Sequence, residues 1–201
     1  MPQDLTSLTG LLGLASAILS VAALVPYLLD VVRGRTQPKR ASWLIWSIIS
    51  AISFASLVYE GATDSLWFVG AQASGTATVF FLSVGMGRGE YLSRTDMGVL
   101  ACAAVGIVLW LSTENAAWSL AMNIAVSSLG GSVTVAKAYR RPASETMSTW
   151  LLLATAAALS VASVGSLDWV LLAYPLYLFA LYTAIVAAML LGRTSVARPG
   201  T

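Results

Sequence analysis

The chain has 201 residues, of which 58% are hydrophobic and only 10% are charged, with a net charge of +2 and a mean hydropathy of +0.80. A soluble domain carries about 25% charged residues, so this composition excludes an ordinary water-exposed surface and predicts a membrane protein. The chain has no histidine and one cysteine, Cys102, which excludes histidine-based metal sites, histidine general bases and an intrachain disulfide.

Seven apolar runs are long enough to cross about 30 Å of hydrocarbon as helices. Backbone polar groups in lipid must be satisfied within the segment, and the alternating pattern of barrel strands is absent. In chain order the runs cover residues 8–32, 42–59, 65–86, 97–112, 116–138, 148–165 and 169–191. We therefore expect an all-α protein with seven transmembrane helices, in which short connections make successive helices antiparallel neighbours.

Lysine and arginine are confined to alternate connections and to the C-terminal tail. All eleven fall on one side of a seven-span chain, while the other side carries acidic residues only: Asp4, Glu60, Asp64, Glu114 and Asp168. By the positive-inside rule this predicts an outside N-terminus and a cytoplasmic C-terminus. The start of the chain, MPQDLTSLTG, lacks a basic region, so the first run is expected to be a retained span. The expected location is the plasma (inner) membrane, with the lipid bilayer as partner.

The region around Pro26 to Trp46 has a counterpart later in the chain. Aligning Trp43 with Trp150 sets an offset of 107 residues, under which Arg33 matches Arg140 and Leu44 matches Leu151. This similarity predicts an internal duplication. The expected units are a first three-helix repeat (1–95), a linker helix (96–115), a second three-helix repeat (116–192) and a cytoplasmic tail (193–201). Because the single linker helix makes the spacer odd, the two repeats share one orientation, which is the parallel type of repeat.

Two stretches carry a family resemblance. LGGSVTVAKAYRRPASETMSTW resembles the SWEET pattern of a lysine, further basic residues and Ser-x-Glu-x-Met before the sixth helix, and VPYLLDVVRGRTQPKRASW resembles the PQ-loop entry. The sequence departs from that pattern at Tyr27, where the family has glutamine, at Val133 or Ser132, where it has a second proline, and at Leu176, where it has asparagine. The resemblance to the SWEET/PQ-loop family implies the 3+1+3 topology with an outside N-terminus and a role in solute transport.

Polar residues within the apolar runs are candidates for a solute cavity, since polar groups are costly in lipid. Gln72 and Asn123 lie at similar depth, and the duplication aligns Ser16 with Asn123 and Ser20 with Ser127. Ser16 and Ser20 are spaced i, i+4, as are Asn123 and Ser127, so each of these two pairs lies on one helix face. The alternative is that these groups only join helices, at about 0.6 kcal/mol each. Two aromatic residues beside Pro175 complete the predicted solute site: Tyr174 and Tyr177.

Four residues are candidates for a gate or hinge. Asp30 and Lys137 are equivalent under the offset and have opposite charge, which suggests an ion pair closing the inner mouth; alternatively each extends separately to the membrane interface. Pro26 and Pro175 lie within helices, where each removes a backbone hydrogen bond and produces either a hinge or a static kink.

The tryptophans have a simpler interpretation. They lie at span ends and are expected to be interfacial anchors, not a binding cage: Trp43, Trp67, Trp110, Trp118, Trp150 and Trp169.

The expected function is a small-solute carrier. A cavity of amide, hydroxyl and tyrosine groups suits a neutral polar solute such as a sugar or a vitamin- or nucleoside-like compound, bound at the repeat interface. No acidic residue lies at mid-membrane, so the expected mechanism is uniport by alternating access or facilitated diffusion. The alternative is a non-transporting sensor, sorting receptor or complex subunit on the same scaffold. We expect no enzyme activity, cofactor, metal or nucleic acid; the solute and the oligomeric state, including a homo-oligomer, stay open.

Overall fold

Each predicted apolar run is helical in the part of the chain that the structure describes. The computed structural model describes residues 7–59, 65–87, 89–112, 116–167 and 169–196, and the side chains of most of them. The elements are α1 (Leu8–Ala22), α2 (Leu24–Arg33), α3 (Arg40–Tyr59), α4 (Ser65–Gly85), α5 (Arg94–Leu111), α6 (Ala116–Arg140), the 3₁₀ turn η1 (Pro142–Ser144), α7 (Met147–Ser163) and α8 (Trp169–Val196). These residues form no strand, only one isolated bridge between Lys39 and Glu90. The fold is therefore all-helical, and α8 continues to Val196, past the end of the predicted run at residue 191.

The first predicted helix is interrupted. α1 ends at Ala22 and α2 begins at Leu24, because Pro26 has no N–H to donate to the carbonyl one turn before it. α2 stops at Gly34, whose φ of 73° suits glycine, and the Arg35 N–H closes the end by donating to the Asp30 carbonyl at 2.8 Å. Of the two prolines that were expected to produce a hinge or a kink, Pro26 lies beside the interruption, whereas α8 continues unbroken through Pro175.

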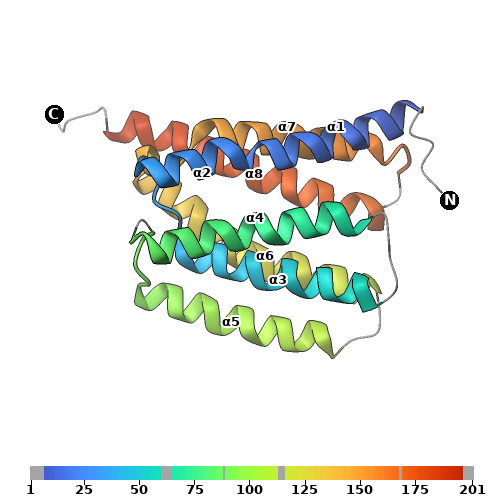
Figure 1. Cartoon of the computed structure of the whole chain (residues 1–201), viewed down its shortest axis with the longest axis horizontal. Helices are drawn as coiled ribbons and strands as arrows, with labels where there is room; N and C mark the ends of the chain where they lie inside the picture. The colour runs from blue at the N-terminus through green and yellow to red at the C-terminus, as the bar shows by residue number, and fades with distance from the viewer. Residues whose placement is uncertain (1–6, 60–64, 88, 113–115, 168, 197–201) are drawn as a thin grey trace.

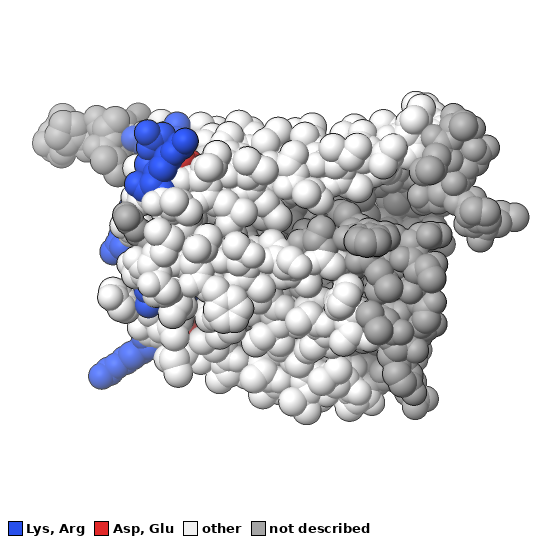
Figure 2. All heavy atoms as spheres, in the orientation of Figure 1, with Lys and Arg blue, Asp and Glu red and all other residues white. Residues whose placement is uncertain are grey.

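α1 and α2 run in one direction along the long axis of the molecule, and from α2 on the direction of the α-helices alternates (Figure 1). The arginines and lysines that end α2, α6 and α8 or begin α3 and α5 therefore meet at one end, which we call the cationic end. Figure 2 shows the blue side chains gathered there, with the middle of the visible face free of charge.

Three described helices are long and apolar enough, by length and composition, to cross a membrane: Leu8–Arg33, Arg94–Leu111 and Leu171–Thr194. Three further apolar helices are shorter: Arg40–Ala55, Ala73–Gly85 and Met147–Ser163. Large apolar side chains also lie on the outside of the bundle, including Phe81 at 68% exposed and Val105 at 61%. An apolar exterior of this extent is unusual for a soluble monomer.

The helices pack as two similar groups. In the first group α4 lies between α3 and the α1–α2 helix, and in the second α8 lies between α7 and α6. The groups meet along two lines, where α1 packs on α7 and α3 packs on α6, and α5 covers α6 and α3 from outside (Figure 1).

The α3–α6 contact shows what allows the close approach. Gly130 faces α3, and a Cβ added there would lie 3.2 Å from Trp46 Nε1, which is closer than most side chains approach, and 3.5 Å from the Ser42 Cα. The Ser42 hydroxyl donates to the Gly130 carbonyl and accepts from the Thr134 hydroxyl, each at 2.7 Å. The absence of a side chain at Gly130 thus permits a buried hydrogen-bonded contact between the two groups.

Candidate functional site

A cavity of about 50 Å³ lies where the two groups meet; we call it the central cavity. A cavity needs a volume of about 10–15 Å³ to hold one water, so the central cavity has room for a few waters in this conformation. Both groups contribute to its wall. The described lining residues are Ser20, Leu24, Trp43, Trp46, Ile49, Ser50, Thr76, Ser127, Trp150, Leu153, Tyr174, Leu178, Leu181 and Tyr182.

The lining combines indole rings with hydroxyl groups and contains no charged side chain among its described residues. The Ser127 hydroxyl is held by the Tyr177 hydroxyl at 2.9 Å, and its backbone carbonyl accepts from Trp46 Nε1 at 3.4 Å. Hydroxyl groups both donate and accept hydrogen bonds, and indole rings offer flat apolar surfaces. The central cavity is therefore suited chemically to an uncharged molecule with hydroxyl or amide groups.

The predicted solute-binding residues divide into three sets. Ser20, Ser127 and Tyr174 line the central cavity, and Tyr177 reaches it through Ser127. Ser16 is buried and donates to the Ala156 carbonyl of α7 at 2.7 Å, so it joins α1 to α7 as the alternative interpretation expected.

The third set consists of the two predicted amide residues, Asn123 and Gln72. Asn123 is not among the lining residues, and its buried Oδ1 accepts no hydrogen bond. Gln72 lies on α4, but its side chain is outside the described residues.

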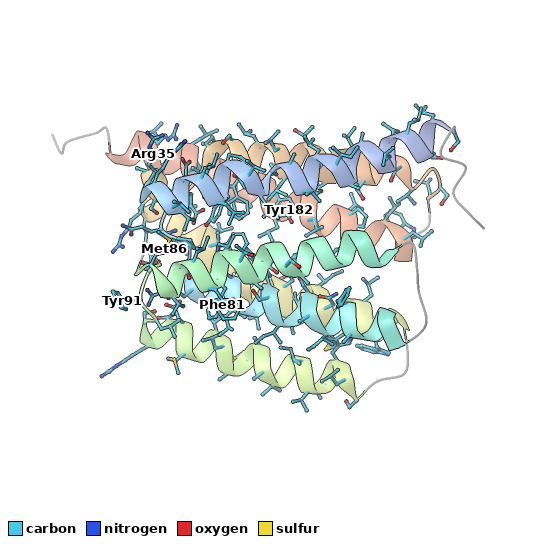
Figure 3. The ribbon with its side chains drawn as sticks, viewed as in Figure 1. Arg35, Phe81, Met86, Tyr91 and Tyr182 are labelled. Atoms are coloured by element: carbon cyan, nitrogen blue, oxygen red, sulfur yellow. The ribbon has the colours of Figure 1, made fainter. Side chains whose placement is uncertain are left out.

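An aromatic layer separates the central cavity from the cationic end; we use this name for Tyr27, Trp43, Trp46, Trp150 and Tyr182. Ring centroids are 4.9 Å apart for Tyr27–Trp43, 6.1 Å for Tyr27–Trp150 and 6.0 Å for Trp150–Tyr182. Trp43 lies in the first turn of α3, whereas the cavity residue Ser50 is about 15 Å from the start of that helix. Figure 3 shows Tyr182 well inside the bundle, away from Arg35 and Tyr91 at the cationic end.

The expectation that Trp43 and Trp150 are interfacial anchors is wrong. They are 3% and 1% exposed, and each indole N–H has a buried acceptor. Trp43 Nε1 donates to the Tyr27 hydroxyl at 3.1 Å, and Trp150 Nε1 donates to Glu145 Oε2 at 3.0 Å. By contrast, Trp118 and Trp169 lie at helix ends and face outward, with exposed fractions of 61% and 75%.

A buried ion pair lies beneath the aromatic layer. Lys137 Nζ is 2.6 Å from Glu145 Oε1, and the two side chains are 3% and 0% exposed. Lys137 also donates to the Gln37 carbonyl of the first connection, and the Tyr27 hydroxyl lies within reach of the Glu145 carboxylate. The free energy lost when two charges are removed from water is offset only if their remaining polar atoms also have hydrogen-bond partners. Here lysine, indole and phenol groups surround the Glu145 carboxylate.

The predicted Asp30–Lys137 ion pair is absent. Among the described residues Asp30 forms no ion pair; its Oδ2 accepts from the Thr146 hydroxyl at 3.0 Å. Lys137 is buried against Glu145, so the alternative of a lysine extended to the interface is wrong as well. Equivalent positions of a two-fold repeat touch only when they lie on the axis, and here the η1 turn brings Glu145 nearer.

The connections at the cationic end also bind each other. The Gln37 N–H donates to the Ser144 carbonyl at 3.0 Å, and the Thr36 and Thr146 hydroxyls are 2.5 Å apart. Since Thr146 gives its proton to Asp30, Thr36 is the donor to Thr146. These contacts, which we call the connection interface, join the first group to the second beside the Lys137–Glu145 pair.

Sequence reasoning missed Glu145 as a member of the site and misassigned the two tryptophans. Two signals pointed to them. Glu145 is the only acidic residue of its own connection, where it lies close to Arg140 and Arg141. Trp43 and Trp150 are identical residues at equivalent positions of the duplication.

Comparison of the chain with protein-family models, curated proteins and solved structures gives no match. The described residues contain no group of three or more His, Cys, Asp or Glu that is arranged to hold a metal ion.

Proposed function

We propose that the chain is an integral membrane carrier of small neutral polar solutes that works by alternating access, here closed toward its cationic end. One observation carries the proposal. The central cavity is lined by both helix groups, and the Thr36–Thr146 and Lys137–Gln37 contacts, which lie between it and the cationic end, also join those groups. A relative movement of the groups that breaks these contacts would connect the cavity to that end.

The membrane location of the proposal rests on the surface of the molecule. Large apolar side chains face outward between the two ends, and the described lysines and arginines are collected at one end (Figure 2). With seven spans, the positive-inside rule makes the cationic end cytoplasmic and the N-terminus external.

The proposed 3+1+3 repeat is supported by the order of packing. Under the duplication α1–α2 corresponds to α6, α3 to α7 and α4 to α8. The third helix lies between the other two in each group, and the contact of α1 with α7 has its counterpart in the contact of α6 with α3. This is the arrangement that the resemblance to the SWEET/PQ-loop family implies, and sites at such a repeat interface are the expected place for a transported solute.

The proposed solute class follows from the lining. Ser20, Ser127 and Tyr174 supply hydroxyl groups and Trp46 and Trp150 supply ring faces, while no described lining residue offers a charge to balance an ion. A sugar or a vitamin- or nucleoside-like compound fits that chemistry. The present cavity holds a few waters, so such a solute requires the cavity to widen by movement of the helix groups.

Uptake into liposomes tests the proposal. Purified protein is reconstituted and exposed to a panel of radiolabelled neutral solutes, with liposomes that carry no protein as the control. The proposal requires saturable uptake of at least one solute that stops at equilibrium and needs no ion gradient. Binding of a solute in the absence of any flux would favour the alternative, a non-transporting sensor or complex subunit.

A further inference from the structure

A second hollow opens at the cationic end and is lined by arginines from three segments; we call it the arginine pocket. Its volume is about 840 Å³. The described lining residues are Arg35 and Gln37 between α2 and α3, Arg140 at the end of α6, Arg141, Pro142, Ala143 and Ser144 between α6 and α7, and Arg193 of α8. No carboxylate is among them.

The charges of the arginine pocket are poorly neutralised by the described residues. Arg35, Arg140 and Arg193 form no ion pair there, and Arg141 is 3.4 Å from Glu90 with its side chain 62% exposed. A neighbouring hollow shows the contrast. Its Lys39 is 2.8 Å from Asp96 and 3.2 Å from Glu90. The chain thus balances its buried lysines with acids but leaves three of the four pocket arginines, Arg35, Arg140 and Arg193, without an ion pair among the described residues.

The backbone beneath the arginine pocket is well fixed. Gly192 of α8 lies against the Tyr139 main chain so closely that an added Cβ would be 3.0 Å from the Tyr139 carbonyl carbon. This contact places Arg193 beside Arg140. The Ser144 N–H donates to the Arg141 carbonyl at 2.9 Å, which holds the η1 turn. Arg35, from the other helix group, lies at the same end of the molecule (Figure 3).

We propose that the arginine pocket binds a phosphate group. Guanidinium groups match phosphate oxygens with paired hydrogen bonds, and a concave site gathers several of them around one anion. The proposed transport of neutral solutes uses none of these arginines, so the proposal goes beyond it. The phosphate has two sources, an anionic phospholipid headgroup or a soluble phosphate. Exposed Leu190, on the same face of α8 as Arg193, offers apolar surface to an acyl chain.

Binding measurements on the detergent-solubilised protein test the proposal without reference to transport. Phosphatidylglycerol adducts are counted by native mass spectrometry, with phosphatidylcholine as the uncharged reference, and inorganic pyrophosphate is titrated separately by calorimetry. The test variant is Arg35→Gln with Arg193→Gln. The matched control is Arg33→Gln with Arg94→Gln, which removes two exposed arginines outside the pocket.

We expect the pocket variant to bind its phosphate ligand roughly 25-fold more weakly, at roughly fivefold per arginine, and the control variant to bind as wild type does. Loss of phosphatidylglycerol alone assigns the lipid as the source, and loss of pyrophosphate alone assigns a soluble phosphate. Equal weakening in the two variants, or wild-type protein that binds neither probe, overturns the proposal. Melting temperatures without ligand establish that both variants are folded.

Discussion

Lys137 and Glu145 form an ion pair of 2.6 Å in which the two side chains are 3% and 0% exposed. The pair joins the end of α6 to the start of α7, and the Gln37 carbonyl and Trp150 indole bind its two members. It therefore connects the second helix group to the first connection directly beneath the aromatic layer. We take it to be the central element of the closed cationic end.

Removal of one member of the pair should destabilise the protein strongly. Lys137→Met leaves a buried carboxylate unpaired and Glu145→Met leaves a buried ammonium unpaired, at about 3–5 kcal/mol each. The double variant Lys137→Met with Glu145→Met should recover most of that loss. Denaturant unfolding in detergent gives the four free energies of a double-mutant cycle.

The matched cycle combines Lys137→Met with Asp30→Asn. Because Asp30 binds Thr146 and not Lys137, its coupling to Lys137 should be small. A larger coupling for Asp30 than for Glu145 would mean that the pairing described here is incorrect.

The positions of the helices were predictable from the sequence, whereas the partners at the cationic end were not. Runs of apolar residues and the placement of cations depend on the solvent around each segment, which is a local property. The partner of Lys137 depends on the path of residues 141–146, where the η1 turn directs Glu145 inward. No spacing rule distinguishes that path from one that leaves Lys137 opposite Asp30.

The tryptophans show the same limit. Trp43 and Trp118 both lie near helix ends, where indole is common at a membrane interface. Trp43 is nevertheless buried because Tyr27 of α2 packs against it beside Trp46 of its own helix, while Trp118 faces outward. Which side of a helix faces the other group is set by the packing of the whole bundle.

The Tyr27 hydroxyl should stabilise the aromatic layer measurably. Tyr27→Phe leaves the Trp43 indole N–H without its acceptor, and an unsatisfied buried donor costs about 1–3 kcal/mol. Unfolding free energies of the wild type and variant provide the measurement. Tyr91→Phe is the control, since Tyr91 is 77% exposed, and a similar loss in both variants would show that the hydroxyl contact is unimportant.

A leucine in the central cavity should stop uptake. Ser127 lines the cavity and is 3% exposed, whereas Ser132 lies on the exposed side of the same helix. Ser127→Leu fills space that a solute needs, and Ser132→Leu adds the same side chain outside it. Solute uptake by reconstituted protein, normalised to folded protein, should fall at least tenfold for the first variant only; normal uptake by Ser127→Leu would exclude the cavity as the solute site.

The two ends of the bundle should lie on opposite sides of the membrane. Arg35→Cys at the cationic end and Leu167→Cys, where the leucine is 85% exposed, are each introduced into a Cys102→Ala background. An impermeant maleimide added to intact cells should label position 167 only, and position 35 should react after the cells are opened. Labelling of both positions from outside would contradict the seven-span topology.

Alternating access requires the two helix groups to separate at the connection interface, and a reversible cross-link tests this most directly. The Thr36 and Thr146 hydroxyl oxygens are 2.5 Å apart, so Thr36→Cys with Thr146→Cys in the Cys102→Ala background places two sulfurs within reach of a disulfide. The measurement is uptake, by reconstituted protein, of the solute that the liposome screen identifies, before oxidation, after oxidation and after reduction, with Thr36→Cys alone as control. If the groups must separate, oxidation of the double variant stops uptake and reduction restores it, while the single variant is unaffected. Uptake that continues at the original rate through fully cross-linked protein would contradict this requirement.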